Sequence, residues 1–92
     1  MNNLIVLNQN DNVGVSQFII PEKTKIKGHE ISTVDPIPFG HKVCLKTIKK
    51  GDPIIKYDQI IGFALDDIKP GQHVHSHNLE FREFKRDFKV TD

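Results

Sequence analysis

Three of the five histidines in this chain lie within one short run, His73-Val74-His75-Ser76-His77-Asn78. On a strand, side chains two residues apart point to the same face, so the three imidazoles would share one face of a sheet. Imidazole is the side chain that titrates nearest to neutral pH, and it is a common metal ligand. The run therefore predicts a site for proton transfer or metal binding. The alternative is a solvated polar strand.

A metal site on this run would need a ligand from another part of the chain. His73 and His75 could share one ion, with a third ligand from His41, His29 or Glu80. The spacing resembles the ligand set of cupins, but that set needs a further histidine on a later strand, and none follows the run. The sequence also contains no Cys-x-x-Cys, no His-Glu-x-x-His and no calcium loop. A self-contained metalloprotein is one hypothesis among several.

Other kinds of chemistry have weaker support in the sequence. Cys44 lies among apolar residues of an expected strand, which favours a small buried residue over a nucleophile. Tyr57 lies between Lys56 and Asp58, where a turn aromatic resting on the core is the simplest interpretation. The glycines occur in turn or strand contexts and form no phosphate-binding loop. Aromatic residues are not interleaved with the basic ones before the C-terminal tail, which argues against RNA binding.

The bulk properties are those of one small globular domain. The chain has 92 residues, 37% of them hydrophobic and 27% charged, with a formal net charge of +1. This balance gives no argument for nucleic acid or an acidic membrane as partner. The single cysteine fits a reducing compartment, and the N-terminal residues have neither the basic start nor the long apolar run of a signal peptide. We expect a cytoplasmic protein that does not contact the membrane.

A weak internal repeat predicts the fold. The segments 15–26, 43–54 and 63–74 align at three apolar anchors each: Val15, Val43 and Phe63, then Ile20, Ile48 and Ile68, then Ile26, Ile54 and Val74. Three residues after the middle anchor come Gly51 and Gly71 in the later copies and Lys23 in the first. Each copy therefore predicts a strand, a tight turn and the start of another strand. Frequent Gly and Pro exclude long helices before residue 79.

The repeat also orients the histidine run. Val74 aligns with Ile26 and Ile54, so it should belong to the core. Because side chains alternate along a strand, His73 and His75 should face away from that core. His77 would follow them if the strand continues.

The C-terminal residues differ from the rest of the chain. Phe81, Phe84 and Phe88 recur at spacings of three and four among charged residues, which predicts one apolar stripe of a short helix. Residues 1–79 are expected to form the β domain and residues 80–92 this Phe-rich tail. The tail either covers its own domain or docks on another chain.

These motifs together resemble the SAF domain of the altronate and galactarate dehydratases, and the small subunit of sulfolactate sulfo-lyase is similar. The resemblance covers about residues 13–79 and is carried by Phe39-Gly40-His41-Lys42-Val43-Cys44-Leu45, Ile48, Gly51, Ile55-Lys56-Tyr57, Ile61-Gly62, Ala64, Asp67-Ile68-Lys69-Pro70-Gly71 and His73-Val74-His75-Ser76-His77-Asn78-Leu79. It implies a mostly β domain of the β-clip type, as in type III antifreeze proteins. Two positions depart from the family pattern: Asp58 replaces a usual glycine, and Cys44 replaces a usual alanine.

The resemblance implies a lyase that removes water from a sugar acid, with this chain as a separate small subunit. A large catalytic subunit would be its partner and would hold most of the iron or manganese that such enzymes use. We expect no useful activity from the isolated chain, and homo-oligomerisation is left open. The alternative is a stand-alone carbohydrate- or ligand-binding module. Altronate, galactarate and sulfolactate are not distinguished.

Elimination of water next to a carboxylate needs a base, an acid and stabilisation of the enediolate. Imidazole and lysine side chains suit these tasks, and the candidate residues are of these types or lie beside them. His73 and His75 are the candidate catalytic residues and could also bind metal. The candidate substrate-binding residues are His41, Lys42, Lys56, Tyr57, His77 and Asn78.

Overall fold

The structure, a computed structural model, describes residues 4–6 and 9–80, and for Ile5 the backbone alone. Within these residues the chain forms nine short strands and no helix, as the frequent turn residues predict. The strands are β1 (Leu4–Ile5), β2 (Val13–Ser16), β3 (Lys25–Ile26), β4 (Ile31–Ser32), β5 (Lys42–Cys44), β6 (Pro53–Lys56), β7 (Gln59–Ala64), β8 (His73–Val74) and β9 (Leu79–Glu80).

The predicted Phe81, Phe84 and Phe88 stripe lies outside the described residues. In the part of the chain that is described, no helix is long and apolar enough to cross a bilayer.

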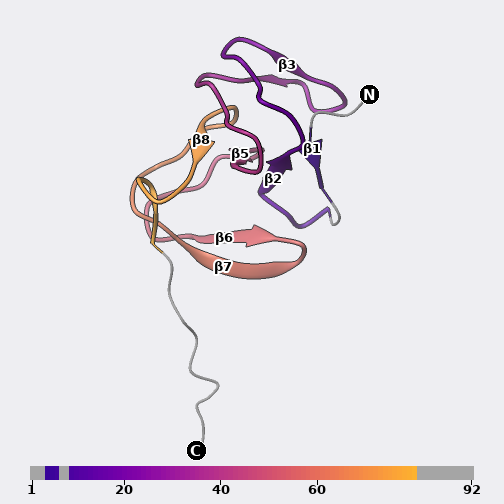
Figure 1. The fold of residues 1–92 in the computed structure, drawn as a ribbon. Helices are drawn as coiled ribbons and strands as arrows, with labels where there is room; N and C mark the ends of the chain where they lie inside the picture. The colour runs from indigo at the N-terminus through magenta and orange to yellow at the C-terminus, as the bar shows by residue number, and fades with distance from the viewer. Residues whose placement is uncertain (1–3, 7–8, 81–92) are drawn as a thin grey trace, which may run out of the picture.

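The strands form three small antiparallel sheets (Figure 1). The largest has the order β1-β2-β5-β8, which makes β8 an edge strand. The β3–β4 hairpin and the β6-β7-β9 sheet are the other two. The central β5 pairs with β2 on one side and β8 on the other, so residues distant in sequence lie side by side there.

Two apolar clusters fill the described part of the molecule. The side chains that form them are mostly β-branched, which suits short pleated strands packed on both sides. One cluster contains Val13, Cys44, Ile48, Ile54, Ala64, Ile68 and Val74. The other contains Leu4, Ile20, Ile26, Ile37 and Val43. The mostly β architecture expected from the sequence is confirmed.

The internal repeat is visible in the backbone. Lys23, Gly51 and Gly71, each three residues after a middle anchor, all have left-handed φ angles of 62°, 88° and 92°. Of the middle anchors, Ile48 and Ile68 bridge one another in an antiparallel pair. The three copies therefore share one turn geometry, although the first uses lysine where the others use glycine.

The anchors themselves are buried with two exceptions. The middle anchors and the third anchors, Ile26, Ile54 and Val74, are at most 1% exposed. Among the first anchors Val43 is fully buried, whereas Val15 and Phe63 are only partly buried. Val74 thus belongs to the core, as its alignment predicts.

The β6–β7 hairpin tolerates its aspartate. Its two-residue loop consists of Tyr57 and Asp58, whose φ angles are 56° and 62°, as a type I′ turn requires. Asp is one of the residues that adopts this conformation more readily than most. The backbone N–H of Asp58 donates a hydrogen bond to Oδ1 of the buried Asp11 at 2.7 Å. The turn therefore forms without the glycine that is usual there.

Cys44 is a buried core residue. Its side chain is fully buried and its thiol donates to the carbonyl oxygen of Lys46 at 2.9 Å. Burial raises the pKa of the Cys44 thiol to about 12, and the bond to Lys46 opposes this only in part. A neutral buried thiol is a poor nucleophile, which confirms the structural interpretation of this residue.

Candidate functional site

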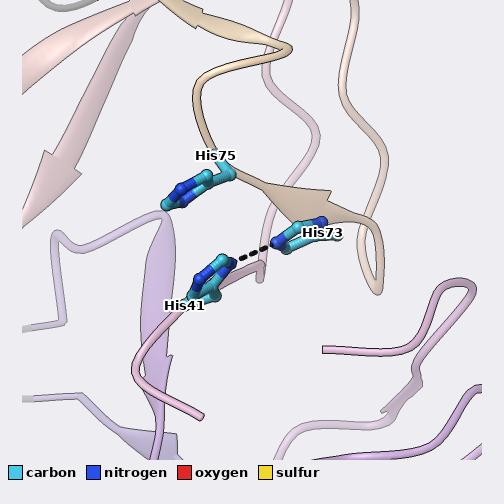
Figure 2. Close-up of side chains that lie close together, drawn as sticks. All are labelled: His41, His73 and His75. Atoms are coloured by element: carbon cyan, nitrogen blue, oxygen red, sulfur yellow. Dashed lines mark hydrogen bonds between the residues drawn. The ribbon is translucent and has the colours of Figure 1, made fainter. Parts of the chain in front are cut away.

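The pairing of β5 with β8 brings His41 to the histidine run. In this antiparallel pair Lys42 is opposite Val74 and Val43 is opposite His73, and His41 directly precedes β5. The backbone of His41 is held from the other side by β2, since the N–H of Ser16 donates to its carbonyl oxygen at 2.8 Å. Figure 2 shows the imidazoles of His41, His73 and His75 gathered at this edge of the sheet.

The three imidazole rings lie nearly parallel. The ring centroids of His41 and His75 are 3.9 Å apart with an interplanar angle of 10°, and those of His41 and His73 are 5.0 Å apart at 17°. Nδ1 of His41 and Nε2 of His73 are 2.8 Å apart, a hydrogen bond in which one ring donates and the other accepts (Figure 2). One ligand atom from each ring can be chosen so that all three lie within 4.8 Å of one another.

The histidine run does not continue as a strand. β8 ends at Val74, and residues 75–78 form a turn that the buried Asn78 holds in place. The Asn78 side chain accepts from the His75 N–H at 3.0 Å and donates to the His73 carbonyl at 2.9 Å. The expectation that alternation along one strand aligns all three histidines is therefore wrong beyond Val74.

His77 reaches the cluster from the turn instead. Its ring lies 5.1 Å from that of His73 at a tilt of 38°. Its side chain is exposed.

The electrostatic environment lowers the pKa of two histidines of the cluster, His73 and His75. Partial burial lowers the pKa of His73, and the nearby His77, His41 and His75 lower it further, while Asp35 acts in the opposite direction. Desolvation also lowers the pKa of His75, followed by His41, Lys42 and His77. Neutral imidazole carries one unprotonated ring nitrogen, so it can accept a proton or bind a metal ion.

One nitrogen in the cluster has no partner. Among the residues that the structure describes, Nδ1 of His75 is buried and makes no hydrogen bond. Buried polar atoms are nearly always paired, so such an atom needs an explanation. A ligand bound between the rings is one such explanation, because it would pair with this nitrogen.

Lys42 lies near the cluster, since its charge lowers the pKa of His75. Burial lowers the pKa of Lys42, and the positive charge of Lys56 on β6 lowers it further. Lys56 Nζ is 5.2 Å from the centre of the Tyr57 ring. The ammonium groups of these two lysines repel one another, and a bound anion such as a carboxylate would reduce this repulsion.

The predicted site residues do not all gather. Tyr57 lies in the β6–β7 turn, whose Asp58 is bonded to Asp11 before the start of β2. His41, by contrast, is bonded to Ser16 at the end of β2. Asn78 uses its amide for the turn. His29, which the sequence offers as a possible third metal ligand, lies in the β3–β4 connection beside Leu4 and Val6.

Sequence reasoning missed Asp35. Its Oδ2 accepts from the backbone N–H of His73 at 3.0 Å, and its charge acts on the His73 ring. Asp35 is 38 residues away in sequence. No local pattern marks it, because the contact exists only once the fold has formed.

Comparison with known proteins identifies a family to which this domain is similar. The family model described as the altronate/galactarate dehydratase SAF domain matches residues 2–82. The altronate dehydratase of Bacillus subtilis (strain 168) is 39% identical over 82 residues, which cover 87% of this chain and 16% of that protein. The altronate dehydratase of Escherichia coli (strain K12) is 40% identical over 70 residues, 74% of this chain and 14% of that protein.

A much shorter relative also matches. The (2R)-sulfolactate sulfo-lyase subunit alpha of Paracoccus pantotrophus is 48% identical over 48 residues, 52% of this chain and 72% of that protein. This chain thus spans a small part of the altronate dehydratases and most of the length of a lyase subunit. The strand-rich architecture and the match over nearly the whole sequence show that the chain belongs to the family of altronate/galactarate dehydratase SAF domains.

Proposed function

We propose that this chain is the SAF component of a sugar-acid lyase of the altronate/galactarate dehydratase type and contributes its histidine cluster to a site completed by a catalytic partner. The observation that carries the proposal is the gathering of His41, His73 and His75 at one sheet edge, in a chain that belongs to this family. The relative named as a subunit alpha supports a separate polypeptide for this role.

The chemistry of the reaction fits what the cluster offers. In such an elimination a base removes the proton on the carbon next to the carboxylate, and an acid protonates the departing hydroxyl, which leaves as water. The resulting enol becomes the 2-keto acid. The lowered pKa of His73 favours the neutral imidazole, which can take up the first proton, and the exposed His77 lies beside it. Lys42 and Lys56 would bind the substrate carboxylate.

The divalent metal of the family, iron or manganese, would stabilise the enediolate when bound. The cluster fits a metal by its donor set of imidazoles and by the unpartnered Nδ1 of His75. On this proposal the isolated chain is inactive, because the base, the acid and the electrophile must surround the substrate together and most of these groups lie on the partner.

An exposed apolar patch next to the cluster is where the catalytic partner would contact the chain. Phe18, Ile19 and Phe39 are 48%, 75% and 68% exposed. Their segments are joined by backbone hydrogen bonds between Ile20 and Ile37, and Phe39 is two residues from His41. Exposed apolar patches on small proteins often mark interfaces. A partner that covers this patch would close the site over the histidines.

Co-purification tests the proposal. A tagged form of the chain is co-expressed with the large lyase subunit and recovered by affinity chromatography. The complex, each component alone and a Phe39→Ser complex are then assayed for dehydration of altronate and galactarate and for cleavage of sulfolactate. We expect turnover of one of these acids by the complex alone, and weaker recovery with Phe39→Ser. Full turnover by either component, or no association, would contradict the proposal; no association favours a stand-alone binding module.

A further inference from the structure

We propose that His41, His73 and His75 form a mononuclear site for a divalent transition metal, which this chain binds without any partner. The inference deepens the proposed function by giving the cluster a ligand role, and it rests on the chain's own residues. His41 directly precedes β5, His73 lies on β8 and His75 follows β8 in the turn. One ring nitrogen from each can be chosen so that the three lie within 4.8 Å of one another (Figure 2).

The distances are close to those of a loaded site. Zinc binds imidazole nitrogen at about 2.0–2.1 Å, so the nitrogens of a tetrahedral site lie about 3.4 Å apart. The distance between Nδ1 of His41 and Nε2 of His73, now 2.8 Å, would have to increase slightly. The widest separation between the three ring nitrogens, at most 4.8 Å, would have to decrease by about 1.4 Å. The nearly parallel rings must also tilt so that their lone pairs converge, and the terminal torsion of histidine permits this because its rotamer wells are broad.

The surroundings hold the ligands without filling the site. The backbones of His41 and His73 are fixed by the β2-β5-β8 ladder and by Asp35, and that of His75 by Asn78. The buried Nδ1 of His75 has no hydrogen-bond partner, and an ion bound at this nitrogen would supply one. A hydrogen-bonded stack of rings would explain the His41–His73 contact, but it leaves this nitrogen unexplained.

The three imidazole ligands also determine which metal ions the site prefers. Imidazole suits zinc, iron, cobalt, nickel and copper, whereas magnesium and calcium prefer oxygen ligands. Three protein ligands leave a tetrahedral ion one open position, the arrangement of catalytic rather than structural zinc sites. In the assembled lyase this position could take a carboxylate or hydroxyl oxygen of the substrate. Proton transfer would then fall to His77 and to groups of the partner.

Cobalt titration of the purified full chain tests the site. The chain is stripped of metal with a chelator, and Co²⁺ is added while the visible absorption of tetrahedral cobalt is followed; Zn²⁺ binding is measured by calorimetry. We expect one ion per chain. His41→Ala, His73→Ala and His75→Ala should each lose at least about 100-fold in affinity, because even second-sphere partners are typically worth about 10–100-fold. His29→Ala, a histidine outside the cluster, is the matched control and should bind as the wild type does.

Thermal melting provides a second readout on the same proteins. Zn²⁺ in hundredfold excess over Kd should raise Tm by about 10–20 °C in the wild type and in His29→Ala, and by less in the cluster variants. Failure of the wild type to bind either ion, or binding that survives His73→Ala in a folded variant, would overturn the proposal. Neither result bears on co-purification with a lyase subunit, so the two proposals can fail separately.

Discussion

Replacing Gly71 by alanine should destabilise the protein more than the same change at Gly51. The two glycines occupy the same position in two copies of the repeat and have nearly equal φ angles of 92° and 88°. A Cβ at Gly51 would meet nothing within 4 Å, whereas a Cβ at Gly71 would collide with the backbone carbonyl oxygen of Ser32. That residue lies on β4 and is paired with Lys25, so its backbone cannot move freely.

The expected magnitudes follow from this difference. Left-handed backbone costs a residue with a Cβ about 1–2 kcal/mol, and this cost applies to both variants. Overpacking against a fixed group adds about 1–3 kcal/mol at Gly71 alone. For a domain of this size each kcal/mol lowers Tm by about 4–8 °C. Gly71→Ala should therefore melt at least about 4 °C below Gly51→Ala.

Thermal unfolding followed by circular dichroism checks this, with the wild type and both variants in one buffer. Equal melting temperatures, or a lower one for Gly51→Ala, would refute the close approach of Gly71 to β4. The position of His73, two residues further on, depends on that approach.

Three further predictions concern the core, the thiol and the β6–β7 turn. Val74→Ala should lower the free energy of unfolding by about 2 kcal/mol, since it removes two buried carbons and leaves a cavity. His75→Ala should change it by no more than about 0.5 kcal/mol. If His75→Ala melted earlier than Val74→Ala, the assignment of Val74 to the core and of His75 to the outside would be wrong. Because the pKa of Cys44 is raised from 9.0 to about 12, the unfolded chain loses its thiol proton first as pH rises. Tm should accordingly fall above about pH 9, and less steeply in Cys44→Ala; parallel profiles would contradict this. At Asp58, where φ is 62°, Asp58→Val should lower the free energy of unfolding by about 1–2 kcal/mol, whereas Asp58→Gly should leave it unchanged. Thermal melting checks this, and equal Tm values for the two variants would contradict the left-handed turn.

Much of the fold could be predicted because the repeat encodes it locally. The anchors Ile48 and Ile68 and the turn glycines that follow them are recognisable in the sequence, and they pair and turn as expected. Lys23 shows the limit of this reasoning, since its left-handed backbone follows from its place in the repeat and not from its residue type. Strand ends were less predictable, because Asn78 stops β8 through side-chain bonds that a hydrophobic pattern does not reveal.

The candidate site was predictable in part. Alternation around Val74 correctly put His73 on the side away from that core residue, since the strand there is regular. The contact of His41 with His73 depends on the register of β5 against β8, and the role of Asp35 depends on a bond across 38 residues. Such long-range relations have no signal in local periodicity. His41 entered the candidate set as one of three possible third ligands and through the family motif, with no sequence signal for its contact with His73.

Turnover by the assembled lyase carrying His73→Ala tests the central claim most directly. Removal of His73 takes away one hydrogen bond to His41, worth about 1 kcal/mol, so the variant should fold and still co-purify with its partner. If the cluster belongs to the active site, kcat should fall by about 10²-fold or more, whereas His29→Ala should keep the wild-type rate. A folded, fully assembled His73→Ala enzyme that turns over at the wild-type rate would contradict the account.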